Sequence, residues 1–259
     1  MIDIRLSENL ELMKTLPDKS IDLIYGDILY GTGRKFEDYQ DLKPKREIIE
    51  EHYIPRIKEM YRLLKDTGSI YLQMDCKISH WLRCILDDIF GYDNFRNSII
   101  WSYDLADNSK KNYAKKHDII LFYTKSKQWI FNCNEIRIPY NEKTIKRYAS
   151  KSKVGFGGKI SELNKKGKIP NNVWKDIDIE RMNNVYNTQK PKKLIERIVK
   201  ASSNEGDLVA DFYAGSFTTA EVCINLNRNF IGCDISEKGV NIGRDRCKNM
   251  IKTKKLFNI

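Results

Sequence analysis

DLVADFYAGSFTTAEVCINLNRNFIGCDIS, residues 207–236, contains two apolar runs separated by a stretch with helical spacing. Each run ends on an aspartate, Asp211 in the first and Asp234 in the second. A strand, a turn of small residues, a helix and a second strand make up the βαβ unit of parallel sheets. The stretch therefore predicts a parallel sheet with both carboxylates at the carboxyl ends of its strands, where open α/β sheets place their ligands.

The rest of the chain continues the same alternation of apolar runs and helical patterns. We place the start of one helix at Ser79, a residue type that caps helices, and its end at Gly91. The alternation predicts an α/β fold, a doubly wound and mostly parallel sheet with helices on both faces. Further strands are expected at residues 1–7, 20–27, 67–75, 98–104 and 117–125, and further helices at 8–17, 45–64 and 188–206.

The charge of the chain is concentrated in one segment. The 259 residues carry a net charge of +11, and the segment from Lys110 to Pro170 holds 16 Lys and Arg against 4 Asp and Glu. Such a run is either a solvated surface or a contact for a polyanion. Because it accounts for the whole excess, we favour nucleic acid. Residues 126–187 also lack a clear period, which predicts a basic recognition insert.

The positions of the cysteines, histidines and apolar residues argue against a metalloprotein, a disulfide-bonded protein and a membrane protein. The six cysteines form no C-x-x-C pair and the three histidines do not cluster with them. We therefore expect reduced thiols, no metal site and a cytoplasmic location. The sequence has no run of 18 apolar residues and no signal-peptide pattern, so we expect no membrane span.

The turn that follows Asp211 contains a single glycine, Gly215. A turn that binds pyrophosphate needs three closely spaced glycines. An acid at the end of the next strand, here Asp234, can accept hydrogen bonds from two ribose hydroxyls. The pattern favours an adenosine cofactor without phosphates, of which S-adenosylmethionine (SAM) is the common one. The alternative is an ordinary βαβ unit in which Gly215 is structural.

A second junction between a strand and a loop occurs in DLIYGDILYGTG, residues 22–33. The apolar run ends at Asp27, and Tyr30 and two glycines follow. Side chains at such a junction lie at the edge of the sheet that carries the chemistry. The alternatives are a helix cap or loop carboxylate for Asp27 and a core aromatic for Tyr30.

Several blocks of the chain, in their order, resemble one enzyme family, the β-group of SAM-dependent DNA amino-methyltransferases, which act on adenine N6 or cytosine N4. The resemblance implies a Rossmann-like methyltransferase fold with a seven-stranded sheet and a permuted order in which the catalytic motif precedes the cofactor turn. It also implies a catalytic half at 1–125, a target-recognition region at 126–187 and a cofactor-binding half at 188–259. The blocks are NLELMKTLPDKSIDLIYGD (9–27), GSIYLQMD (68–75), KKHDIILFYTK (115–125), NTQKPKKLIERIVKASSNEGDLVADFYAGSFTTA (187–220) and RNFIGCDIS (228–236).

The resemblance assigns the tetrad Asp27, Ile28, Leu29 and Tyr30 to catalysis. The lone pair of a nucleobase amine is delocalised into the ring, so the nitrogen is a poor nucleophile. A carboxylate and a carbonyl that accept its two hydrogens would favour the reactive, pyramidal nitrogen. Asp27 and the carbonyl of Ile28 would be these acceptors, and Tyr30 would stack on a base extruded from the duplex.

The resemblance also implies a set of cofactor-binding residues. Glu8 would contact the adenine, Asp234 the ribose, and Lys190 the carboxylate of the cofactor, although Lys190 is alternatively one more surface lysine. The full set is Glu8, Asn9, Asp27, Thr188, Gln189, Lys190, Pro191, Asp211, Phe212, Ala214, Gly215, Ser216, Phe217, Thr218 and Asp234.

The chain departs from the family pattern in both halves of this site. Ile28 and Leu29 replace two prolines, Phe212 replaces a proline, Phe217 replaces a glycine, and Glu8 stands where aspartate is usual. These changes imply a reshaped pocket, a changed cofactor or target, or a loss of catalysis. Because the acidic and aromatic site residues persist, we expect activity.

Residues of the basic segment would bind DNA. Lysines would contact phosphates, and aromatic side chains would contact bases or wedge between them. The lysines are Lys115, Lys116, Lys151 and Lys153, and the aromatic residues are Tyr113, Tyr140, Tyr148 and Phe156, for which packing within the segment is the alternative.

Together these observations predict a site-specific, SAM-dependent DNA methyltransferase that acts on double-stranded DNA. We favour adenine N6 over cytosine N4 because the tetrad begins with aspartate, and the small recognition segment is compatible with a homodimer. The two alternatives are a catalytically silent, methyltransferase-like DNA-binding subunit and an RNA base methyltransferase.

Overall fold

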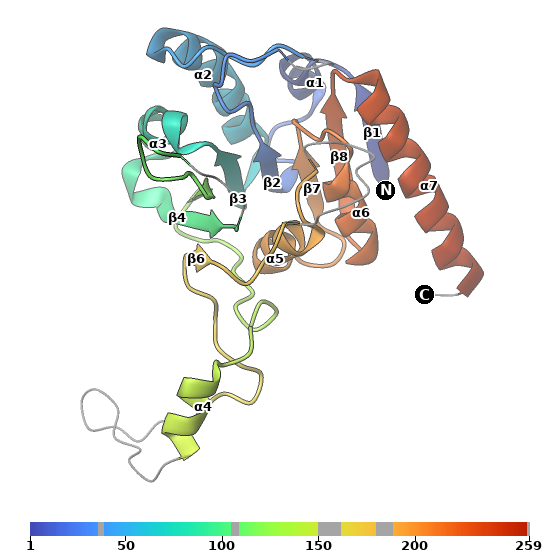
Figure 1. Ribbon diagram of the computed structural model, residues 1–259. Coiled ribbons are helices and arrows are strands. Elements are labelled where there is room, and N and C mark those ends of the chain that lie inside the picture. Colours follow the sequence, from blue (N-terminus) through green and yellow to red (C-terminus); the bar gives the residue numbers. More distant parts are fainter. Residues whose placement is uncertain (36–38, 105–108, 150–161, 180–188, 258–259) are drawn as a thin grey trace.

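The computed structural model describes residues 1–35, 39–104, 109–149, 162–179 and 189–257. In this part of the chain a single sheet has the strand order β1-β8-β7-β2-β3-β5-β4-β6 (Figure 1). The strands are β1 (Ile2–Leu6), β2 (Ile21–Asp27), β3 (Leu64–Met74), β4 (Phe95–Ser102), β5 (His117–Thr124), β6 (Val173–Trp174), β7 (Leu208–Asp211) and β8 (Asn229–Asp234).

The sheet has eight strands, one more than the seven expected. The additional strand, β6, has two residues and pairs in parallel with β4 through Ile100↔Val173 and Trp101↔Trp174. It comes from the segment 126–187, where the sequence shows no period. Two residues are too few to produce a periodic pattern, so the sequence could not reveal this strand.

The direction of the strands brings several chain segments to one edge of the sheet. β1, β8, β7, β2 and β3 are parallel, whereas β5 is antiparallel to both β3 and β4. The last residues of β2, β7 and β8 therefore lie at the same edge as the first residues of β5. This places Asp27, Asp211 and Asp234 near Asp118, the second residue of β5.

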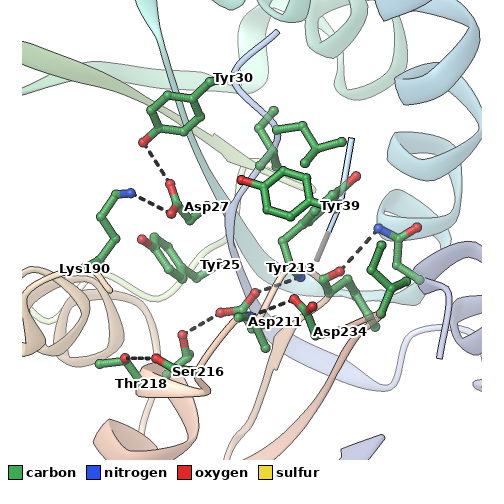
Figure 2. A pocket seen from close by; sticks show the side chains of 18 of the residues that line it. Tyr25, Asp27, Tyr30, Tyr39, Lys190, Asp211, Tyr213, Ser216, Thr218 and Asp234 are labelled. Atoms are coloured by element: carbon green, nitrogen blue, oxygen red, sulfur yellow. Dashed lines mark hydrogen bonds and ion pairs between the residues drawn. The ribbon is translucent and has the colours of Figure 1, made fainter. Parts of the chain in front are cut away.

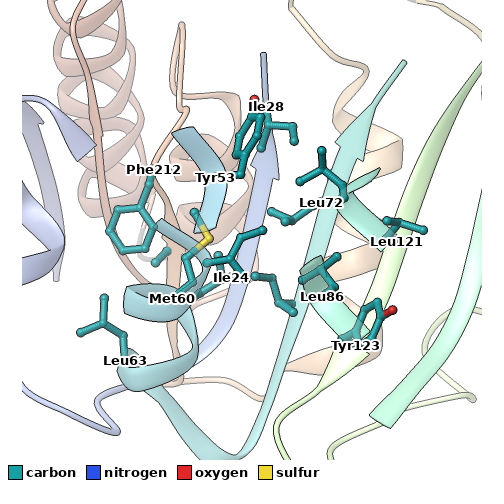
Figure 3. Close-up of a cluster of buried hydrophobic side chains, with 14 of the residues drawn as sticks. Ile24, Ile28, Tyr53, Met60, Leu63, Leu72, Leu86, Leu121, Tyr123 and Phe212 are labelled. Carbon is teal, nitrogen blue, oxygen red and sulfur yellow. The ribbon is translucent and has the colours of Figure 1, made fainter. Parts of the chain in front are cut away.

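Helices cover both faces of the sheet, as the alternating pattern predicts (Figure 1). One face carries α1, α2 and α3, which pack on a core that includes Ile24, Leu72 and Tyr53 (Figure 3). The other face carries α5, α6 and α7 on a core that includes Leu23 and Tyr25. The helices are α1 (Asn9–Thr15), α2 (Arg46–Leu63), α3 (Cys76–Phe90), α4 (Glu142–Ala149), α5 (Lys192–Ser202), α6 (Thr218–Asn225) and α7 (Glu237–Phe257), with a 3₁₀ turn η1 (Tyr92–Asn94).

The start of α3 differs from the expectation. The helix begins at Cys76 and is capped by Asp75, whose Oδ1 accepts from the backbone N–H of Lys77 at 2.7 Å. Ser79 lies inside the first turn, where its hydroxyl donates to the carbonyl of Cys76. The predicted cap at Ser79 was therefore wrong, because Asp75, which directly follows β3, caps the helix one turn earlier.

Part of the segment 126–187 packs on the sheet domain and part extends away from it. The side-chain amide of Asn132 donates to the carbonyls of Lys200 and Ser203, and the indole of Trp101 donates to the carbonyl of Ile177. Helix α4, by contrast, lies well apart from the sheet (Figure 1). An α-helix here was not expected from the sequence.

Candidate active site

A cavity of about 310 Å³ lies at the carboxyl ends of β2, β7 and β8 (Figure 2). Asp27 and Asp234, which belong to distant parts of the chain, both line it. The structure thus brings most of the predicted site residues around one space. Those in its wall are Asn9, Asp27, Ile28, Leu29, Tyr30, Gln189, Lys190, Asp211, Phe212, Ala214, Gly215, Ser216, Thr218 and Asp234.

The carboxylate of Asp27 is held by two neighbours. Lys190 Nζ donates to Oδ2 at 2.6 Å, and the hydroxyl of Tyr30 lies 2.9 Å from Oδ1 (Figure 2). Burial raises the pKa of Asp27, and the ammonium of Lys190 opposes this rise. The Lys190 ammonium also lies 5.1 Å from the centre of the Tyr30 ring, a cation–π distance.

A second carboxylate, Asp118 of β5, completes this cluster, and the sequence prediction missed it. Asp118 Oδ2 lies 2.6 Å from the Tyr30 hydroxyl and accepts from Gln73 Nε2 at 2.7 Å, while Oδ1 accepts from the Tyr103 hydroxyl at 3.0 Å. Tyr25 in turn donates to Gln73. Asp118 could have been found as an acid at the start of an antiparallel strand, which places it at the edge where the parallel strands end.

The backbone of the tetrad is held by hydrogen bonds at Ile28 and Leu29, the two positions where the resemblance leads one to expect proline. The N–H of Ile28 donates to the carbonyl of Gln73 at 3.1 Å, and the hydroxyl of Tyr53 donates to the carbonyl of Leu29 at 2.9 Å. The side chain of Ile28 is buried in the core (Figure 3). These contacts fix the loop without the restricted φ of proline.

The buried carboxylate of Asp41 stabilises the loop after the tetrad. It accepts from the N–H groups of Gly31, Thr32 and Leu42, at 3.1, 2.7 and 2.8 Å. Gly31 has a positive φ of 64°, and a Cβ there would lie 2.7 Å from Ile78, so glycine is required. Asp41 therefore sets the path of the chain that closes the cavity.

The turn after β7 is organised by two aspartates. Asp211 Oδ1 accepts from the N–H of Tyr213 at 3.0 Å, and Oδ2 accepts from the Thr219 hydroxyl at 2.6 Å. The N–H of Gly215 donates to Asp234 Oδ2 at 2.8 Å. Burial raises the pKa of Asp211 to about 7.

Three predicted cofactor residues do not line the cavity. Glu8 caps α1 through the N–H of Glu11 and forms an ion pair with Arg56. Pro191 is the buried N-cap of α5. Phe217 is fully buried below the turn, because its left-handed backbone (φ 59°, ψ 38°) directs the ring into the core. Direct contacts of these three side chains with the cofactor therefore stay predictions.

The remaining predictions concern residues of the basic segment, together with Thr188. Some of these residues are described by the structure and others are not. Lys115 forms an ion pair with Asp75, and Lys116 forms one with Asp104. Tyr113 is almost completely exposed. Thr188, Lys151, Lys153 and Phe156 lie outside the described residues.

Other residues of the cavity wall were not expected from the sequence. His52 of α2 is one of them, and burial together with the charge of Arg56 lowers its pKa to about 4. Some of these residues, such as Tyr213 and Thr219, are neighbours of predicted site residues in the sequence, whereas others, such as His52, come to the cavity only through the fold. They are Ser7, Tyr25, Thr32, Tyr39, Gln40, Asp41, His52, Ile195, Tyr213, Thr219 and Ile235.

A more open, polar groove borders the same edge of the sheet. It contains Arg34, Lys77, Lys115 and His117, and it shares Thr32 with the cavity. Tyr103, which donates to Asp118, also lines this groove. The groove therefore leads from a surface with several cationic side chains to the cluster of Tyr30 and Asp118.

Two features are absent from the described part of the chain. No group of three or more His, Cys, Asp or Glu side chains in it could hold a metal ion. Among the described helices, none combines the length and the apolar character needed to cross a membrane.

Comparison with known proteins agrees with this geometry. The family model for N6/N4 DNA methylases matches residues 21–245. The type II methyltransferase M.HpaI of Haemophilus parainfluenzae is 34% identical over 93% of this chain and 72% of its own length. The DNA adenine methyltransferase YhdJ of Escherichia coli K12 is 30% identical over 90% of this chain and 78% of its own length.

Solved structures share the fold. The cytosine-N4-specific PvuII DNA methyltransferase superposes with a TM-score of 0.69 at 17% identity, over 97% of this chain and 90% of that one. The M1.HpyAVI–SAM complex superposes with a TM-score of 0.59 at 22% identity, over 95% of this chain and all of that one. The chain therefore belongs to the N6/N4 DNA methylase family and is a SAM-dependent DNA methyltransferase.

Proposed function

We propose that the enzyme methylates the N6 amine of an adenine extruded from double-stranded DNA, with Asp27 as the acceptor of the amine hydrogen. The observation that carries the proposal is the position of Asp27 in the same cavity as Asp234 and the turn at Gly215. A carboxylate at the start of the tetrad favours adenine. YhdJ, a relative at 30% identity, is named a DNA adenine methyltransferase.

The cavity wall suits SAM. Asp234 offers a carboxylate for the ribose hydroxyls, and Asn9 and Ile235 line the same side of the space. When bound, SAM supplies an electrophilic methyl group. Gln189 and Lys190 line the cavity from the segment that precedes α5, where they would hold the amino acid end of the cofactor.

Asp27 would first bind the amine by hydrogen bonding, and its raised pKa would then help it to take up the proton. A carboxylate oxygen can accept more than one hydrogen bond, so Asp27 can bind the amine while Tyr30 and Lys190 hold it in place. Hydrogen bonding to the amine favours the nucleophilic nitrogen and its developing positive charge. The raised pKa suits a group that finally takes up the proton which the nitrogen loses.

Tyr30 would support the extruded base by stacking. Its ring lines the cavity, and its hydroxyl lies between Asp27 and Asp118. The hydrogen bond of its hydroxyl therefore positions the ring before a base arrives, which reduces the ordering that binding requires. The cationic groove beside it would receive the phosphates that flank the base.

The recognition sequence would be read by residues 126–187, and the enzyme would act in the cytoplasm. All six cysteines are free, which supports a reducing compartment. We also propose a homodimer, because a short recognition segment contacts few bases. Sedimentation at several concentrations tests the homodimer, and a monomer at all of them would exclude it.

The experiment that tests the function uses SAM with a labelled methyl group, duplex DNA and the Asp27→Ala variant. We expect label in N6-methyladenine for the unchanged enzyme and a loss of at least about a hundredfold in rate for the variant. SAM and DNA should still bind the variant with little change. Single-stranded RNA is the matched substrate control.

Each of the other possible results would contradict one part of the proposal. Label in N4-methylcytosine would contradict the choice of adenine, and preferred labelling of RNA would contradict the choice of DNA. DNA binding without SAM binding would indicate a catalytically silent subunit. Full activity of Asp27→Ala would show that Asp27 does not have the proposed role.

A further inference from the structure

Helix α7 packs against the turn after β7 through two glycines at which a Cβ would not fit. A Cβ at Gly239 would lie 2.5 Å from the carbonyl oxygen of Gly215, and a Cβ at Gly243 would lie 2.6 Å from the ring of Phe217. Real Cβ atoms essentially never come this near to another atom. Positions 239, 243 and 246 follow the spacing of four and three residues that defines one helix face. This face of α7 therefore lies directly against residues 214–218.

Phe217 has a backbone conformation that residues with side chains rarely adopt. Its φ of 59° and ψ of 38° are left-handed, and it is the N-cap of α6. Its N–H donates to the carbonyl of Ala214 at 2.7 Å, which closes the turn. The ring is fully buried, lies edge-on to Phe230 with the centres 6.2 Å apart, and also packs against Gly243. The unfavourable backbone is therefore kept in place by packing of the ring.

Arg246 adds polar contacts from the same face of α7. Its guanidinium donates to the carbonyl of Ser216 at 3.3 Å and to Gln189 Oε1 at 3.0 Å. It also lies 3.5 Å from the carboxylate of Glu221. Gln189 precedes Lys190, which binds Asp27. One helix thus contacts both the turn and the segment that reaches the catalytic carboxylate.

We propose that Gly239, Gly243 and Arg246 are positioning residues of the SAM site, and that α7 holds the turn 214–218 in the form that binds the cofactor. The ring of Phe217 transmits the position of α7 to the backbone of Gly215, whose N–H donates to Asp234. The inference rests on the proposed role of this turn and of Asp234 in binding SAM.

The Gly243→Ala substitution tests the proposal because its effect on the site should be opposite to its effect on an ordinary helix. In an ordinary helix this change is favourable, because alanine has a higher helix propensity than glycine. Here the added methyl group must displace Phe217, and the turn with it. We expect the dissociation constant for SAM, measured by titration calorimetry, to rise about tenfold, with kcat at saturating SAM and DNA within about twofold of the unchanged enzyme.

The Phe217→Gly substitution provides a rescue. Glycine accepts the left-handed backbone and, in the double variant, leaves room for the methyl group that Gly243→Ala adds. We expect the tenfold effect of Gly243→Ala on SAM binding to shrink to about twofold in the Phe217→Gly background. A purely structural weakening of α7 would add to the effect of Phe217→Gly and would show no rescue.

Two further variants complete the experiment. Asn241→Ala, on the exposed side of α7, is the matched control and should leave SAM binding unchanged. Arg246→Gln removes the contacts to Ser216 and Gln189 without adding volume. If Gly243→Ala does not fold, this variant tests the role of α7 in its place. Arg246→Gln should raise the dissociation constant for SAM about fivefold at unchanged DNA affinity.

The failure of this inference can be told apart from the failure of the proposed function. If the unchanged enzyme binds SAM and Asp234→Ala does not, the site is correct. Folded Gly243→Ala and Arg246→Gln variants that then bind SAM normally would overturn the role of α7. If Asp234→Ala binds SAM as well as the unchanged enzyme, the assignment of the turn itself is wrong.

Discussion

At the scale of single residues, the site depends on how two carboxylates share one phenol. The Tyr30 hydroxyl has one hydrogen, yet it lies within hydrogen-bond distance of both Asp27 and Asp118. Gln73 and Tyr103 also donate to Asp118, so this buried carboxylate has three donors around it. Asp118 is therefore suited to fix the Tyr30 ring, and in the proposed reaction Asp27 would bind the amine.

The Asp118→Asn substitution should show this role. An amide keeps the shape but loses the charge that orients the Tyr30 hydroxyl, so we expect kcat to fall about tenfold while the affinity for SAM stays constant. Tyr30→Phe is the partner variant. If Asp118 acts through the hydroxyl of Tyr30, Asp118→Asn causes little further loss in the Tyr30→Phe background, and additive losses would contradict the account.

Asp211 gives a prediction about pH and stability. Burial raises its pKa to about 7 in the folded protein, whereas an aspartate in an unfolded chain titrates near about 4. Between these pH values the folded state holds more protons than the unfolded state. The contribution of Asp211 to the free energy of unfolding should therefore fall as the pH rises from about 4 to about 7 and then level off.

Urea denaturation at a series of pH values measures this effect. The free energy of unfolding of the unchanged protein minus that of Asp211→Asn should fall as the pH rises through that window, because only the aspartate becomes charged. Asp245→Asn, at an exposed site on α7, is the control substitution. A value of this signed difference that rises with pH would contradict the burial argument.

At the scale of helices and strands, the structure shows which sequence patterns predicted an element correctly. The apolar runs that end in Asp27, Asp211 and Asp234 are strands, because burial on both faces of a parallel sheet produces an uninterrupted apolar sequence. α7 was not expected, because Gly239 and Gly243 lower its helix propensity and their packing on the turn is a tertiary effect. His52 reaches the site only through the packing of α2, which no local pattern encodes, whereas Asp118 is an acid at the start of a strand whose antiparallel direction the sequence did not reveal.

The cap of α3 is testable at this scale. Asp75→Ala removes the acceptor for the N–H of Lys77 and should lower the free energy of unfolding by about 1 kcal/mol. Ser79→Ala, at the position first expected to be the cap, should cost less than about 0.5 kcal/mol. Equal effects of the two substitutions in urea denaturation would contradict the assignment of Asp75.

At the scale of the whole molecule, the basic excess and the aspartates that line the cavity come from different segments of the chain. The basic excess lies between Lys110 and Pro170, and the sheet domain brings the acidic site residues to one edge. The order of the chain, with the tetrad before the cofactor turn, does not disturb this arrangement. β2 lies beside β7, which in turn pairs with β8, so the strands that carry the three aspartates are neighbours in the sheet.

The charge distribution predicts strong salt dependence of DNA binding. Each phosphate contact releases counterions, so affinity for duplex DNA, measured by fluorescence anisotropy, should fall at least about tenfold between about 50 and 200 mM salt. SAM binding, at a site within the sheet domain, should change far less over the same range. DNA affinity that is independent of salt would exclude the basic segment as a phosphate-binding surface.

The central claim is that SAM and the target amine meet in the cavity between Asp27 and Asp234, and a crystal structure of the enzyme with bound SAM tests it most directly. We predict the ribose hydroxyls of SAM at the Asp234 carboxylate and its methyl group directed toward Asp27. SAM bound outside this cavity, or bound with its methyl group facing away from Asp27, would contradict the account.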